Sequence, residues 1–167
     1  MKKILIIVDY QNSFKNSESS KTVARINALA TKHKWDSIIQ TMWFNSQEEE
    51  SLYIKNLDYS ECTPYDRSSG LVKKFQGANI VTRYDKYSCL DDNLARSLHG
   101  DCMTYVAGWE TDACVLGTCF DLFDRGIPFK VVTDCIASKN VDIHNSAVNI
   151  MRRNFGDVIF VESGGIE

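Results

Sequence analysis

Residues Tyr105–Cys119 read YVAGWETDACVLGTC and join a short apolar run to a helical pattern through a tight turn. The apolar run reaches Gly108, and the helical pattern begins at about Thr111. This layout places Cys114 in the first turn of a helix that follows a strand. Unpaired N–H groups and the helix dipole favour a thiolate there. The alternative is that Cys114 is a buried apolar side chain, as many free cysteines are.

Outward from this stretch, apolar runs alternate with amphipathic helical patterns. The expected strands are Lys3–Val8, Ser37–Trp43, Asn79–Arg83, Met103–Ala107, Pro128–Thr133 and Val158–Val161. The expected helices are Thr22–Lys34 with Ser19 or Ser20 as N-cap, a turn at Leu71–Phe75, Asp91–Leu98, Thr111–Asp124 and His144–Arg153. Residues 45–67 are expected to form a long loop with one short helix.

Strands that alternate with helices predict βαβ units and right-handed crossovers. The fold class is therefore α/β. We expect a three-layer αβα sandwich with a mainly parallel, Rossmann-like sheet of six strands. With 167 residues and no linker-like tract, the chain is expected to form one domain over residues 1–167.

Composition narrows the function classes. The net charge of −3 gives no electrostatic case for nucleic acid or an anionic membrane, and no apolar stretch approaches the length of a membrane span. The N-terminal apolar run is too short for the core of a signal peptide, so we expect a cytoplasmic protein. The six cysteines form no CxxC pair, which argues against a disulfide framework and a thiol redox protein.

Polar groups gather at the carboxyl ends of the expected strands, where α/β sheets bind ligands. Asp9 follows the first strand, Lys86 follows the third, and Cys114 follows the fourth. A carboxylate can take the thiol proton, and a cation can orient the carboxylate. Each residue also has a structural alternative, as a turn residue, a solvated cation or a buried thiol.

The chain resembles the isochorismatase-like cysteine hydrolases, which include nicotinamidases. Residues 106–115, VAGWETDACV, are similar to the nucleophile motif of that family, and residues 5–12, LIIVDYQN, resemble its aspartate-bearing strand. The resemblance implies a triad of Asp9, a lysine and Cys114, a covalent thioester-type intermediate, and a homodimer or homotetramer. It also implies an oxyanion site at the turn of Trp109 and Glu110, often with a cis peptide bond.

The lysine departs from the family pattern. Aligned without gaps on Tyr87 and Ser88, its place is taken by Tyr84, with Arg83 and Asp85 on either side. We favour Lys86, displaced by two residues, as the third member of the triad. The alternative is a chain without a correctly placed lysine, which would be a catalytically silent small-molecule-binding or assembly protein.

This chain also lacks the residue types that form the metal site of the nicotinamidases. Residues 41–46, TMWFNS, contain neither Asp nor His, and the histidines elsewhere are scattered, so we expect no metal and no other cofactor. We therefore expect a metal-independent cysteine hydrolase that cleaves a small-molecule amide or related C–N bond. Glu110 either recognises a polar substrate group or faces solvent. The expected substrate-pocket residues are Gln11, Trp43, Phe44, Tyr84, Tyr87 and Trp109.

Overall fold

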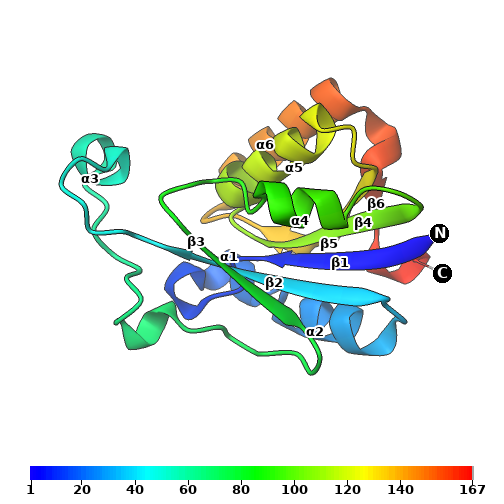
Figure 1. Ribbon diagram of the computed structural model, residues 1–167, viewed down its shortest axis with the longest axis horizontal. Coiled ribbons are helices and arrows are strands. Elements are labelled where there is room, and N and C mark those ends of the chain that lie inside the picture. The colour runs from blue at the N-terminus through cyan, green and yellow to red at the C-terminus, as the bar shows by residue number, and fades with distance from the viewer. Residues whose placement is uncertain (167) are drawn as a thin grey trace.

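The computed structural model describes residues 1–166 (Figure 1). Its strands are β1 Lys2–Val8, β2 Ser37–Phe44, β3 Asn79–Tyr84, β4 Cys102–Trp109, β5 Phe129–Ala137 and β6 Phe160–Val161. Its helices are α1 Ser17–Ser20, α2 Val23–Lys32, α3 Leu52–Leu57, α4 Asp92–Ser97, α5 Leu116–Asp124 and α6 Val141–Phe155. No helix within this range is long and apolar enough to cross a membrane.

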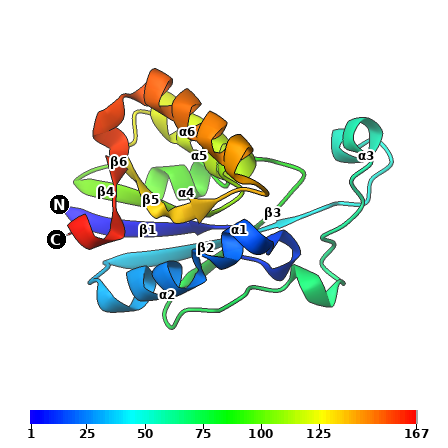
Figure 2. The same ribbon diagram turned by 180° about the vertical axis from the view of Figure 1, so that it is seen from behind.

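The strands form one sheet in the order β3-β2-β1-β4-β5-β6, and every pairing between neighbouring strands is parallel. Helices α4, α5 and α6 lie on one face, and α1 and α2 lie on the other, as both views show (Figures 1 and 2). The predicted three-layer α/β fold is confirmed. The strand order reverses between β1 and β4, the point at which sheets of this kind open a crevice for ligands.

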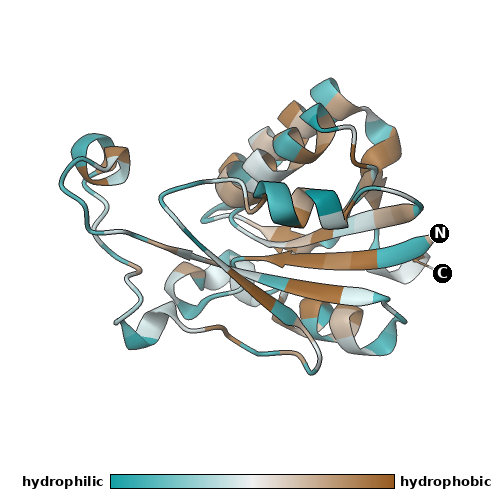
Figure 3. Ribbon diagram, viewed as in Figure 1, coloured by the Kyte–Doolittle hydropathy of each residue, from teal (hydrophilic) through white to brown (hydrophobic). Residues whose placement is uncertain are grey.

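The first strand supplies both faces of the core, because successive side chains of a strand point to opposite sides. Ile4, Ile6 and Val8 belong to a cluster with the apolar side chains of α4 and α5. Leu5 and Ile7 belong to a second cluster with those of α2. The apolar centre of the sheet stands out in the hydropathy colouring of Figure 3. Burial of β1 on both faces therefore explains why its sequence is a continuous apolar run.

Strands β1 and β4 come into close backbone contact at Gly108, which pairs with Val8. Gly108 has a φ of +117°, and a Cβ atom on it would lie 2.1 Å from the carbonyl oxygen of Val8. Glycine is the residue that meets both demands. This contact fixes the position of the end of β4, where the chain enters the turn to Cys114.

Two local expectations are wrong. Neither Ser19 nor Ser20 caps α2, whose N-cap residue is Thr22 and has no side-chain cap hydrogen bond. Both serines belong instead to the separate short helix α1, which Asn16 caps by accepting from the Glu18 and Ser19 N–H groups. Residues 71–75 form no helical turn. Their polar backbone groups bond to neighbouring segments instead: the Val72 N–H donates to the Tyr10 carbonyl at 2.9 Å, and the Gln40 side chain bonds Lys73 and Phe75.

The expected long loop forms an arm, which we define as residues 45–67. The arm carries the one short helix expected there, α3, which projects away from the sheet beyond the ends of β2 and β3 (Figures 1 and 2). Leu52 and Leu57 of α3 are exposed. The base of the arm is fixed by Asn45, whose N–H donates to the Cys62 carbonyl at 3.0 Å.

Replacement of Gly108 by alanine tests the β1–β4 contact. We expect Gly108→Ala to lower the free energy of unfolding by about 3 kcal/mol or more, because backbone on both strands has to move. Gly100→Ala is the matched control, since Gly100 also has positive φ but a Cβ atom on it would meet no heavy atom within 4 Å. Gly100→Ala should lower the free energy of unfolding by about 1–2 kcal/mol. Urea unfolding measures both, and equal costs would contradict the steric explanation.

Candidate active site

Asp9 lies directly after β1, at the point where the strand order reverses. Its φ of +47° is a left-handed value that Asp tolerates better than most residues. The side chain is buried, and Thr41 on β2 holds it: the Asp9 N–H donates to Thr41 Oγ1 at 3.1 Å, and that hydroxyl donates to Asp9 Oδ1 at 2.8 Å. A buried carboxylate requires a partner of opposite charge or several hydrogen-bond donors.

Arg83 on β3 supplies the opposite charge. Its Nη1 and Nη2 donate to Asp9 Oδ1 and Oδ2, each at 2.7 Å, in a bidentate pair. Nε donates to the Lys86 carbonyl and Nη2 also to the Tyr87 carbonyl, each at 2.8 Å. Burial alone would lower the pKa of Arg83, but the Asp9 carboxylate outweighs it and raises that pKa. The guanidinium is a permanently charged, fixed group.

The expectation that the Lys86 amine lies beside Asp9 is wrong. Its amine donates to the carbonyl of Leu90, whereas the ion pair of Asp9 within residues 1–166 is with Arg83. The physical reason is the turn after β3, which directs the Lys86 carbonyl, rather than its side chain, towards the Arg83 guanidinium. Arg83 is thus the cation beside Asp9 in this structure.

Cys114 lies in one turn of π-helix, Thr111–Val115, between β4 and α5. The Val115 N–H donates to the Glu110 carbonyl at 3.1 Å, the five-residue spacing of a π turn. The peptide bond between Trp109 and Glu110 is cis. The start of the turn is tied to α6, because Thr111 Oγ1 lies 3.0 Å from Nδ1 of His144.

The thiol of Cys114 is held protonated, contrary to the thiolate expected at a helix start. Burial raises the pKa of Cys114 well above its usual range, and the Asp9 carboxylate, as a charge and as a hydrogen-bond acceptor, raises it further. Arg83 acts in the opposite direction but does not prevail. A nucleophilic role for Cys114 would therefore require a base for its proton, and Asp9 is the carboxylate beside the thiol.

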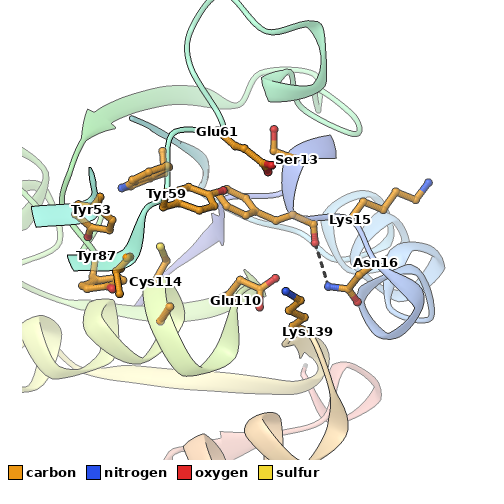
Figure 4. A pocket seen from close by; sticks show the side chains of 14 residues that line it. Ser13, Lys15, Asn16, Tyr53, Tyr59, Glu61, Tyr87, Glu110, Cys114 and Lys139 are labelled. Atoms are coloured by element: carbon orange, nitrogen blue, oxygen red, sulfur yellow. Dashed lines mark hydrogen bonds between the residues drawn. The ribbon is translucent and has the colours of Figure 1, made fainter. Parts of the chain in front are cut away.

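A pocket of about 400 Å³ opens above Cys114 (Figure 4). Aromatic rings form one wall, two of them from the arm, and charged side chains lie at the opposite end. The residues that line it are Ser13, Phe14, Lys15, Asn16, Trp43, Tyr53, Leu57, Tyr59, Glu61, Tyr87, Glu110, Ala113, Cys114 and Lys139.

Glu110 is part of this pocket and is partly buried. Burial raises its pKa to about 7, and the nearby charge of Asp112 adds to that effect. The backbone N–H and the ammonium of Lys139 counteract it. In Figure 4 the carboxylate of Glu110 points towards Lys139 rather than towards the sulfur of Cys114. It therefore belongs to the end of the pocket away from the thiol.

A family model described as the isochorismatase domain matches residues 3–163. The chain belongs to the isochorismatase family. A secreted isochorismatase effector, Isc1, of Phytophthora sojae is 31% identical over 101 residues, which are 57% of this chain and 48% of that protein. The match thus spans about half the length of that relative.

Solved structures of other family members share the fold. N-carbamoylsarcosine amidase from Thermoplasma acidophilum superposes with a TM-score of 0.82 and 20% identity, over 100% of this chain and 99% of that one. Nicotinamidase PncA from Bacillus subtilis gives a TM-score of 0.79 and 19% identity, over 97% and 100%. A pyrazinamidase of Pyrococcus horikoshii in complex with zinc gives 0.81 and 20%, over 97% and 99%.

The residues of this chain do not fit a zinc site of that kind. Within residues 1–166, no three His, Cys, Asp or Glu side chains gather in a way that would hold a metal ion. After β2, the amide of Asn45 bonds to the Tyr59 carbonyl and the Gln47 N–H, and Ser46 bonds to Asp85. These side chains are engaged in holding the arm.

The expected pocket residues divide into two groups. Trp43 and Tyr87 line the pocket with Cys114 and Glu110. Four others, Gln11, Phe44, Tyr84 and Trp109, do not line it. Gln11 is buried and bonds the backbone of Trp43 and Ser69, and Trp109 is buried with its Nε1 donating to Thr22 Oγ1 at 2.9 Å. Phe44 packs on the exposed Tyr84.

Several residues of the site were not predicted from the sequence. Arg83 ends the predicted third strand, and a cation at the carboxyl end of that strand was a usable signal for a partner of Asp9. Tyr53, Tyr59 and Glu61 lie in the arm, where no periodicity marks which side chains turn inward. Lys139 gave no signal, because it is an exposed lysine after β5.

The raised pKa of Glu110 predicts a pH-dependent stability. Between an unfolded-state pKa of about 4.5 and the folded-state value of about 7, the folded chain holds a proton that the unfolded chain releases, so stability falls as pH rises through this window. Glu110→Gln should therefore raise the free energy of unfolding at pH 8 by about 1 kcal/mol, relative to its effect at pH 4.5. Urea unfolding at the two pH values measures this, and a pH-independent effect would refute it.

Proposed function

We propose that this protein is a metal-independent cysteine hydrolase that cleaves a small-molecule amide or related C–N bond. The observation that carries the proposal is the buried Asp9–Arg83 pair beside the Cys114 thiol, on the floor of a pocket that admits a small molecule. The family gives the reaction class, and two structural relatives are by name amidases of small molecules.

In the first half of the reaction, Asp9 accepts the proton of Cys114 as the sulfur attacks the carbonyl carbon of the substrate. The carbonyl oxygen takes the negative charge, and N–H groups of the turn that contains Glu110 and Cys114 stabilise it. The tetrahedral intermediate then collapses and breaks the C–N bond. The proton held by Asp9 passes to the departing nitrogen, which leaves as ammonia or an amine, and a thioester remains on Cys114.

In the second half, water attacks the thioester carbon while Asp9 again accepts a proton. The C–S bond breaks, the sulfur recovers the proton from Asp9, and a carboxylic acid leaves. Asp9 thus shuttles one proton in each half. The nearby, fixed guanidinium of Arg83 compensates the charge of Asp9 and holds both its oxygens in place, so that the carboxylate is oriented towards the thiol.

An arginine in this place differs chemically from a lysine. A lysine in a buried site can lose its proton, whereas a guanidinium stays protonated and holds a carboxylate with two parallel bonds. Arg83 therefore acts as a positioning residue that carries no proton. In this proposal Arg83 takes the role expected of Lys86. Its charge beside Asp9 supports an active enzyme over a silent member.

Variants of Cys114 and Asp9 test the mechanism. Cys114→Ala and Asp9→Asn should each lower kcat by about a thousandfold or more on any small amide that the protein cleaves, because they remove the nucleophile and its base. Ammonia release measures the rate, and mass spectrometry after rapid quenching should show an acyl adduct on Cys114 alone. Full activity of either variant would refute the cysteine mechanism. A wild-type chain inactive on a broad panel of small amides would favour the silent binding protein.

Variants of Arg83 separate position from charge. Arg83→Lys should keep the fold but reduce kcat by about ten- to a hundredfold, since one of two parallel bonds to Asp9 is lost. Arg83→Met leaves a buried carboxylate without its cation and should cost about 3–5 kcal/mol of stability. Lys86→Met is the matched control, and its kcat should stay within about twofold of wild type, given that its amine does not contact Asp9. A larger loss with Lys86→Met than with Arg83→Lys would restore the lysine triad.

Three broader features remain proposals. We propose one domain over residues 1–167 and a homodimer or homotetramer, for which the exposed apolar side chains on α5 and α6 offer contact area. Those side chains are Phe120, Phe123, Ile143 and Ile150. We also propose a cytoplasmic location, in keeping with six free cysteines within the described residues.

A further inference from the structure

We propose that the pocket above Cys114 selects substrates that carry a positively charged group, such as an ammonium, and that Glu110 is the residue that sets this preference. The inference names the substrate class of the proposed hydrolase and so rests on the proposed function. It is carried by the aromatic wall of the pocket and by the partly buried carboxylate of Glu110, which shares the cavity with the thiol.

The aromatic wall is formed by Trp43, Tyr53, Tyr59 and Tyr87. The rings are tilted against one another, with centroid distances of 5.2 Å for Trp43–Tyr53, 5.7 Å for Trp43–Tyr59 and 5.3 Å for Tyr53–Tyr87. Burial raises the pKa of both Tyr53 and Tyr59, so the two phenols stay neutral. The faces of such rings carry negative potential and attract cations, and tryptophan does so most strongly.

The opposite end of the pocket contains two carboxylates, Glu110 and Glu61. Glu110 has no ion pair within 4 Å among the described residues, and its acidity is weakened by burial and by Asp112. A carboxylate of this kind gains from a cation placed beside it. In Figure 4, a molecule in the cavity would lie between the tyrosines, Glu61 and Glu110, with its reactive carbon over Cys114.

The two lysines of the pocket do not reverse this preference. The side chain of Lys15 points away from the cavity in Figure 4. Lys139 is exposed to solvent, which screens its charge, and its ammonium has the smallest of the effects on the acidity of Glu110. A substrate cation inside the pocket would be closer to the aromatic faces and less screened than Lys139 is.

Charged thiol reagents test the preference without requiring hydrolysis. The probes are the methanethiosulfonates with a trimethylammonium-ethyl, an ethyl and a sulfonato-ethyl group. In each reaction the sulfur of Cys114 forms a disulfide, and methanesulfinate leaves. The rate of modification at Cys114 is followed by peptide mass. Each rate is divided by the rate of the same reagent with free 2-mercaptoethanol. At pH 8 this normalised rate should be about tenfold or more higher for the cationic reagent than for the anionic one.

Glu110→Gln should reduce this cation-to-anion ratio by about threefold or more, because it removes one negative charge from the cavity. Glu49→Gln removes the same charge from an exposed site on the arm, outside the pocket, and should leave the ratio within about twofold. Lys139→Met should increase the ratio. A wild-type ratio near one or in favour of the anion, or a ratio that Glu110→Gln does not change, would overturn the proposal.

The pH dependence of the ratio follows from the ionisation of Glu110, which has Asp112 and Lys139 near it and shares the pocket with Glu61 and Lys15. Since Glu110 gains its charge as pH rises through about 7, the cation preference should grow between pH 6 and pH 8 in wild type. In Glu110→Gln this growth should be absent. An equal rise in both proteins would assign the effect to another group and contradict the role of Glu110.

Three amides of equal length extend the test to turnover: 3-aminopropanamide, butanamide and succinamate, which end in an ammonium, a methyl and a carboxylate. We expect kcat/KM to decrease in that order, and Glu110→Gln to bring the first two together. The reverse order would overturn the proposal. If none of the three and no other small amide is cleaved, the proposed hydrolase fails, while the reagent rates still decide the charge preference.

Discussion

The bidentate pair between Asp9 and Arg83 joins three neighbouring strands at one point. Asp9 follows β1, Thr41 belongs to β2 and Arg83 to β3, and all three meet through hydrogen bonds of 2.7–2.8 Å. A carboxylate taken out of water is tolerated only with such partners. The register of the three parallel strands is therefore tied to the charge balance of the site, and a slip of one strand by one residue would leave a buried charge unpaired.

Burial and the carboxylate of this pair together set the protonation state of the Cys114 thiol. A cysteine at the start of a helix is often activated by the helix dipole, yet here burial and the adjacent carboxylate keep Cys114 protonated. In the proposed mechanism, activation depends on proton transfer between two neighbouring side chains rather than on a preformed thiolate. A protonated, buried thiol is also less exposed to oxidation than a free thiolate, which fits a nucleophile that acts only when a substrate fills the pocket.

The predictable parts of the structure are those set by regular patterns. The six strands follow from apolar runs, and Asp9 and Cys114 follow from their places at strand ends, because the carboxyl ends of parallel strands share one edge. The cation was misassigned, since side-chain direction in the turn after β3 depends on hydrogen bonds of Arg83 that no sequence pattern reveals. The pocket wall from residues 53–61 was missed for the same reason: an irregular segment has no period to show which side chains face inward.

The arm and the ends of the strands contribute different parts of the site. The groups proposed to react lie at the carboxyl ends of the strands, where strand register and buried charges allow little change. Much of the pocket wall comes from the arm, whose helix α3 projects from the sheet and whose length is not set by any strand. Insertions, deletions and substitutions between residues 45 and 67 can therefore alter which molecules fit without disturbing the chemistry. The fold is in this sense open to evolutionary change of substrate through a single surface segment.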